Sequence, residues 1–92
     1  MSQELKKPLT SDQLRAGRAL VRWSAEDLSR SSSVSLRTIR RAELAEQAVT
    51  MTKANNFAIR RALEAAGVEF IDENGGGPGV RLRKRQRPKK TK

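Results

Sequence analysis

Two helix-start signals lie eleven residues apart in this 92-residue chain, and a run of three serines, residues 31–33, separates the segments that they begin. Ser24 can cap the free N–H groups of a first helical turn, and Asp27 follows where a capping box places its acid. Ser35 offers the same kind of cap to the next segment. Because serine side chains bond to nearby backbone and favour turns, the serine run breaks the helical pattern. The sequence therefore predicts a helix over residues 25 to about 31, a tight turn and a second helix.

The second of these helices has two chemically different sides. At about 100° per residue, Thr38, Ile39 and Ala42 fall on one side, which we expect to face a core. The outward set is Leu36, Arg37, Arg40 and Arg41. Because the residues after Glu43 are also helix formers, we expect this helix to run on to about Gln47.

Similar signals predict a further helix on each side of this pair. Thr10 can cap a helix that has Gln13 in the box position and runs to about Arg22. Thr52 can cap a fourth helix that ends before Gly67, a residue suited to a left-handed helix end.

Apolar side chains form one face on each of these two outer helices. The faces consist of Leu14, Gly17, Leu20 and Val21 in the first helix, and Ala58, Ile59, Ala62, Leu63 and Ala66 in the fourth. Phe57 projects elsewhere, with Arg60 and Glu64, and we expect it to pack under the C-terminal segment rather than to mark a subunit contact. We expect Trp23, at a junction of two helices, to anchor the core rather than to stack on bases.

Beyond the fourth helix the pattern changes from helical to extended. Residues 68–71 and 80–83 alternate in character and flank the glycine-rich loop 72–79, which predicts a β-hairpin. A lone hairpin is marginal in water, so it must pack on the helices or pair with another chain, and a free edge strand would allow a symmetric dimer. The glycines do not form a phosphate-binding loop, because a strand rather than a helix follows them.

The chain is strongly basic, with a formal charge of +10 from twenty Lys and Arg residues against ten Asp and Glu residues. Eight of the basic residues and none of the acidic ones lie from Arg81 onward, so residues 1–80 carry only +2. We expect the like-charged tail, residues 84–92, to be disordered when free. Two readings of the tail stay open: an arm that binds phosphates, and a solubilising terminus.

The amino-acid composition offers few side chains that are suited to catalysis. Histidine, cysteine and tyrosine are absent, which removes the usual metal ligands, thiol chemistry and most acid–base options. We therefore expect no enzyme activity, no metal and no cofactor. Without cysteine, signal peptide or apolar run, the sequence also favours a cytoplasmic protein with no membrane partner.

The stretch from Trp23 to Glu43 resembles the helix-turn-helix of phage repressor and Cro proteins, the xenobiotic-response-element family of bacterial regulators. The likeness is carried by Trp23-Ser24, three variable residues and Leu28, then by Val34-Ser35, Thr38-Ile39 and Glu43. It implies an all-α, four-helix bundle of the lambda-repressor type, here with a C-terminal β-hairpin and a disordered basic tail. Some members of the family append such a hairpin, which extends the likeness over roughly residues 10 to 84.

The resemblance also implies roles for individual residues. The helix that starts at Ser35 would be the recognition helix in the major groove of double-stranded DNA. Its base-reading residues would be Leu36, Arg37 and Arg40, which favours a half-site that contains guanine. Contacts to the DNA backbone would come from Ser24, Ser35, Arg41, Lys84 and Arg85.

Three further positions follow from the same likeness. Arg18 would form a partly buried ion pair with Glu43, holding the first helix against the third. Ser33 occupies a turn position that is usually glycine, so it must adopt a left-handed backbone. Ala25 replaces a glutamine that commonly contacts the DNA backbone, so that contact is absent.

Together these observations divide the chain into a flexible N-terminus (1–9), a helix-turn-helix domain (10–66), a β-hairpin (67–83) and a disordered basic tail (84–92). The function they favour is that of a sequence-specific transcriptional regulator of bacterial or phage type, a homodimer that reads two half-sites. One alternative is an antitoxin-like module whose hairpin and tail bind a protein partner such as a toxin. A weaker alternative is a nonspecific nucleic-acid chaperone that acts through its tail.

Overall fold

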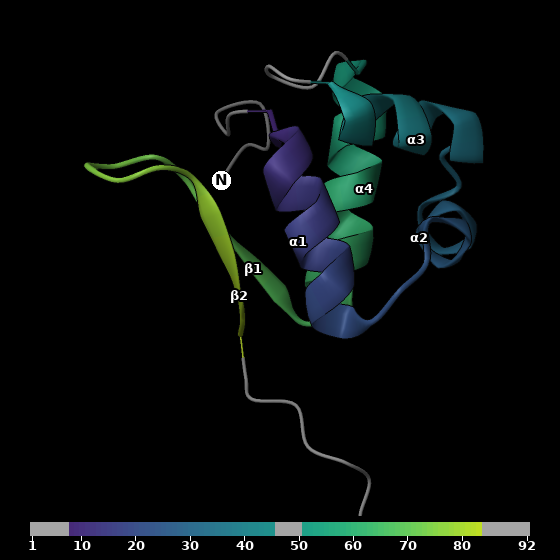
Figure 1. Ribbon diagram of the computed structural model, residues 1–92. Helices are drawn as coiled ribbons and strands as arrows, with labels where there is room; N and C mark the ends of the chain where they lie inside the picture. The colour runs from purple at the N-terminus through teal and green to yellow at the C-terminus, as the bar shows by residue number, and fades with distance from the viewer. Residues whose placement is uncertain (1–7, 46–50, 84–92) are drawn as a thin grey trace, which may run out of the picture.

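The computed structural model describes residues 8–45 and 51–83 of the chain. Within these residues four helices precede an antiparallel hairpin (Figure 1). The elements are α1 (Ser11–Val21), α2 (Ala25–Ser32), α3 (Leu36–Leu44), α4 (Lys53–Ala65), β1 (Val68–Ile71) and β2 (Gly79–Leu82). None of the described helices is long and apolar enough to cross a bilayer.

Side-chain caps begin all four of these helices where the sequence placed them. Thr10 and Gln13 form a reciprocal capping box at α1, and Ser24 and Asp27 form one at α2. The caps of α3 and α4 are the hydroxyls of Ser35 and Thr52, which accept from the N–H groups three residues on. Because these bonds are local in the chain, local sequence was sufficient to predict the four starts.

The end of α3 differs from the expectation that this helix continues to about Gln47. The helix ends at Leu44, and Ala45 is extended, with φ −66° and ψ 140°. The carbonyl of Ala45 accepts a hydrogen bond of 2.8 Å from the hydroxyl of Ser11 on α1. A tertiary contact to α1 thus engages the carbonyl of the extended residue, and residues 46 and 47, over which the helix was expected to continue, lie outside the described residues.

The turn between α2 and α3 contains the left-handed residue that the resemblance implied. Ser33 has φ 63° and ψ 20°, a conformation that costs residues other than glycine some free energy. Two neighbouring hydroxyls bond the backbone of Val34: Ser29 donates to its carbonyl at 2.7 Å, and Ser32 accepts from its N–H at 3.1 Å. These local bonds offset part of the cost, so a serine can serve here.

The hairpin packs on the helices, as one of the two expected arrangements requires. Val68 pairs with Leu82 and Phe70 with Val80, so these four side chains share the face turned towards the domain. The hairpin lies on one side of α1, and α2 and α3 lie on the other (Figure 1). A Cβ at Gly17 would lie 3.4 Å from Leu63 of α4 and 3.7 Å from the ring of Phe70, which are ordinary van der Waals distances, so α1, α4 and the hairpin approach each other closely here without requiring glycine.

The core draws side chains from every helix and from β1. Its members are Leu9, Leu14, Ala25, Leu28, Val34, Ile39, Ala42, Ile59, Leu63 and Val68. Leu9 corrects the expected boundary at residue 10, because its side chain is fully buried and its N–H donates to Asn56 Oδ1 at 3.0 Å. The packed domain therefore includes a residue that the sequence assigned to the flexible terminus.

The face of α4 that meets the hairpin also differs from expectation. Phe57 was expected to pack under the C-terminal segment, but it is exposed, and Arg61 lies 5.5 Å from the centre of its ring. Arg60 is buried instead, with its guanidinium 5.1 Å from the centre of the Phe70 ring. The long aliphatic stem of arginine can lie along apolar surface while its planar head stacks on an aromatic ring.

Gln13 joins the start of α1 to the hairpin. Its side-chain oxygen accepts from the N–H of Thr10 at 3.0 Å. The side-chain nitrogen donates to the carbonyls of Ile71 and Gly79, at 3.3 and 3.1 Å, in the last residue pair of the two strands. One buried amide therefore satisfies three backbone groups and ties both strands to the helix.

We expect Gln13→Leu to lower the free energy of unfolding by about 2–3 kcal/mol, because three backbone groups lose their partner. Urea unfolding measures the change. Gln13→Glu is the matched control: its carboxylate can still accept from Thr10 but cannot donate to the strands. It should keep the helix start and speed hydrogen exchange at the hairpin amides, whereas unchanged exchange would contradict the link to the hairpin.

Candidate nucleic-acid interface

The outer side of α3 carries three exposed arginines. Arg37, Arg40 and Arg41 are all exposed, as the sequence predicted. Leu36 is half-buried and packs against the core, so the structure places it only partly on the outer side. Within the described residues, the side chains of Arg37 and Arg41 make no hydrogen bond or ion pair. They lie one helical turn apart, so both guanidinium groups are available to a ligand on that side.

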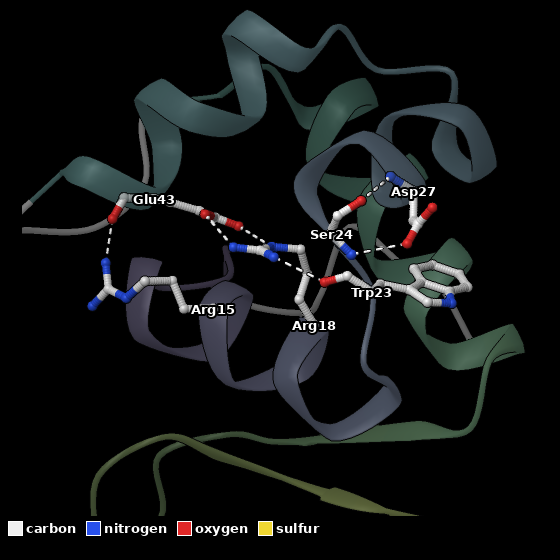
Figure 2. A network of polar contacts seen from close by, with 6 residues as sticks. All are labelled: Arg15, Arg18, Trp23, Ser24, Asp27 and Glu43. Carbon is white, nitrogen blue, oxygen red and sulfur yellow. Dashed lines mark hydrogen bonds and ion pairs between the residues drawn. The ribbon is translucent and has the colours of Figure 1, made fainter.

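The C-terminal end of α3 is fastened to α1 by side chains of the first helix. Arg18 Nε donates to Glu43 Oε2 at 2.6 Å, and Arg18 Nη2 donates to Glu43 Oε1 at 2.8 Å. Arg15 donates to the Glu43 carbonyl (Figure 2). Ser11 donates to the carbonyl of Ala45. The family resemblance predicted an ion pair between Arg18 and Glu43, and the structure shows that it is bidentate. Together with the bonds from Arg15 and Ser11, it fixes α3 against α1.

Arg18 also reaches the junction between α1 and α2. Its Nη1 donates to the carbonyl of Trp23 at 2.9 Å, while the indole of Trp23 is half-buried against the core (Figure 2). The hydrogen bonds to Glu43 raise the pKa of Arg18, and the charges of Glu43 and Glu26 add to the rise while burial opposes it. One guanidinium therefore connects α1, the α1–α2 junction and α3.

A second ion pair connects α2 with the outer side of α3. Arg40 Nη2 donates to Glu26 Oε2 at 3.0 Å, and both side chains are about half exposed. This bond occupies one nitrogen of the Arg40 guanidinium on the outer side of α3. Among the three outer arginines, Arg40 is therefore the one with a carboxylate partner in the described residues.

The expected backbone-contacting serines already serve as helix caps. Ser24 accepts from the N–H of Asp27, whose carboxylate accepts from the N–H of Ser24, both at 2.9 Å (Figure 2). Arg30 donates to the same carboxylate at 2.5 Å. The Ser24 N–H, with help from the Ser24 hydroxyl and Arg30, lowers the pKa of Asp27. The N-terminus of α2 thus already holds an anionic group of its own.

Ser35 is committed in a similar way, because its hydroxyl accepts from the N–H of Thr38 at 3.1 Å and donates to the Thr38 hydroxyl at 2.9 Å. The first turn of α3 contains no acidic residue, which leaves its positive helix end uncompensated. The two tail residues expected at the DNA backbone, Lys84 and Arg85, lie outside the described residues.

Sequence reasoning missed Ser11, Arg15 and Glu26 as partners of α3. Ser11 and Arg15 bond backbone carbonyls 34 and 28 residues away, and Glu26 bonds a side chain 14 residues away. No periodicity or cap links positions so far apart along the chain. Their contribution became visible only once the helices were placed.

The described part of the chain contains no group of three or more carboxylates that could hold a metal ion. No protein-family model matches the chain, and no curated protein sequence matches it.

We expect Glu43→Gln to lower the free energy of unfolding by about 2 kcal/mol, because it leaves the guanidinium of Arg18 without its countercharge in a site where neither side chain is more than 21% exposed. Thermal or urea unfolding measures the loss. Glu69→Gln is the matched control, since it breaks an exposed carboxylate–arginine pair with Arg81 on the hairpin. Equal effects of the two substitutions would contradict a special role for the Arg18–Glu43 pair.

We expect the carboxyl group of Asp27 to titrate below 3.8, the ordinary pKa of aspartate. Since its folded-state pKa is lowered, the charged group stabilises the fold above 3.8, and this contribution is lost as the pH falls through the lower folded-state pKa. Carboxyl-detected NMR titration measures the midpoint. In Arg30→Gln most of the depression should persist, because the Ser24 N–H is its largest cause; a return to 3.8 would instead identify Arg30 as the cause.

Proposed function

We propose that α2, the turn at Ser33 and α3 form a helix-turn-helix, and that the protein is a sequence-specific regulator that reads double-stranded DNA with α3. The observation that carries the proposal is the combination of a rigidly held α3 with exposed arginines on its free side. A helix that enters the major groove needs both properties, because its side chains must reach base edges from a fixed position.

The anchoring of α3 supports the first property. Arg18, Arg15 and Ser11 hold its C-terminal end, and Ile39 and Ala42 are buried in the core. The first turn of α3 contains no acidic residue that would repel a negatively charged ligand. Only the outer side of α3 is then left for recognition, and it cannot rotate without breaking buried contacts.

The arginines support the second property. A guanidinium can donate two hydrogen bonds to O6 and N7 of guanine, and it can also pair with phosphate. In this arrangement Arg37 and Arg40 would contact bases, and Arg41 would contact the DNA backbone. Leu36 would offer a smaller apolar contact to a thymine methyl group, because its side chain is already half-buried.

The competing function is that of a protein-interaction module in which DNA binding is secondary. Leu44 at the end of α3 is 82% exposed, and Phe57 on α4 is also exposed. Exposed large apolar side chains are typical of surfaces that bind another protein, although single ones are common on any surface.

Selection from a random pool of DNA duplexes tests the proposal. We expect the parent protein to enrich a guanine-containing sequence. Arg37→Ala should weaken binding to the enriched duplex by about tenfold or more and weaken binding to an unrelated duplex much less. Arg81→Ala is the matched control, since it removes the same charge from the hairpin, on the far side of α1 (Figure 1).

Three outcomes would contradict the proposal. The first is that no sequence is enriched. The second is that Arg37→Ala and Arg40→Ala weaken binding equally on every duplex. The third is that Leu44→Ser abolishes capture of a protein partner while DNA binding stays weak and unselective, which would favour the interaction module.

A further inference from the structure

The carboxylate of Glu26 stands beside a surface that otherwise presents arginines. It lies in the first turn of α2, and it reaches across to Arg40 on α3, with 3.0 Å between Oε2 and Nη2. An acid in the first turn suits the helix dipole, but the dipole does not explain why this side chain contacts Arg40. At a surface that binds a polyanion, a carboxylate also repels phosphate and lowers affinity.

Stability does not account for the pair. The side chain of Arg40 is 57% exposed and that of Glu26 is 50% exposed. Exposed pairs of this kind contribute little to folding, because water screens the charges and both side chains lose freedom. A role in the bound state explains the contact better than a role in the fold does.

The geometry of the pair leaves part of the guanidinium open. Only Nη2 of Arg40 donates to Glu26, so Nη1 and Nε keep their hydrogens for another acceptor. An arginine held at one nitrogen has fewer orientations, and the carboxylate beside it repels an approaching phosphate. Arg40 is then a poorer partner for phosphate, but it can still donate to the acceptors of a correctly placed guanine.

We propose that Glu26 is a specificity-determining positioning residue, which acts through Arg40 by restraining that side chain for base contact and withholding it from phosphates. This inference rests on the proposed DNA-reading function. It assigns Glu26 a cost in overall affinity and a gain in discrimination between sequences.

The test compares the parent protein with Glu26→Gln on two duplexes of equal length, the most enriched one from the selection and one of random sequence. On the random duplex we expect tighter binding and a salt dependence steeper by about 0.9 in the slope of log K against log salt, since Arg40 becomes free for one more phosphate. The preference for the enriched duplex should fall about fivefold.

Two further variants separate positioning from charge. Glu69→Gln removes the same charge from an arginine pair on the hairpin, and it should leave the preference between the duplexes unchanged. In the Arg40→Ala background, Glu26→Gln should no longer alter the preference, because the residue through which it acts is gone. Circular dichroism should show that all variants are folded.

The inference is overturned if Glu26→Gln and Glu69→Gln have the same effect on both duplexes. It is also overturned if Glu26→Gln lowers the preference equally with and without Arg40. A parent protein that enriches no duplex overturns the DNA-reading function itself, and the role of Glu26 with it. Enrichment by the parent with an unchanged preference in Glu26→Gln overturns the role of Glu26 alone.

Discussion

The bidentate ion pair between Arg18 and Glu43 is the interaction on which the arrangement of the helices most depends. It joins α1 to the last turn of α3, and the same guanidinium bonds the carbonyl of Trp23 between α1 and α2. Two short hydrogen bonds hold the pair together. Because both side chains are largely buried, water screens the attraction between their charges only weakly. It is therefore a strong constraint on where the outer side of α3 points.

A second set of polar contacts, made by Gln13, lies on the opposite side of α1. The buried amide of Gln13 bonds the start of its own helix and both strands of the hairpin. The hairpin contributes Val68 to the core and places Phe70 against Gly17 and Arg60. α1 thus contacts the hairpin on one side and α3 on the other, so the positions of both depend on the same helix (Figure 1).

Sequence reasoning predicted the helix starts and the hairpin, because caps and alternation involve residues close together in the chain, whereas the left-handed Ser33 was expected from the family resemblance. The Arg18–Glu43 pair is not local, and it was expected only because the chain resembles a known family. The burial of Arg60 in place of Phe57 escaped prediction, since helical periodicity groups residues into faces without revealing which face meets the hairpin. The end of α3 at Leu44 also escaped prediction, because Ala45 is extended and its carbonyl bonds Ser11 of another helix.

The sequence by itself determined where the helices begin, where the strands lie and that arginines occupy one side of α3, since these properties depend on neighbours within a few residues. Only the tertiary structure decided that, among the described residues, the side chains of Arg37 and Arg41 have no partner while that of Arg40 is held by Glu26. It also decided that Leu36 is partly withdrawn into the core. The physical reason is that the partners of these side chains come from other helices, and a side chain's availability is set by what packs beside it rather than by its own position in the chain.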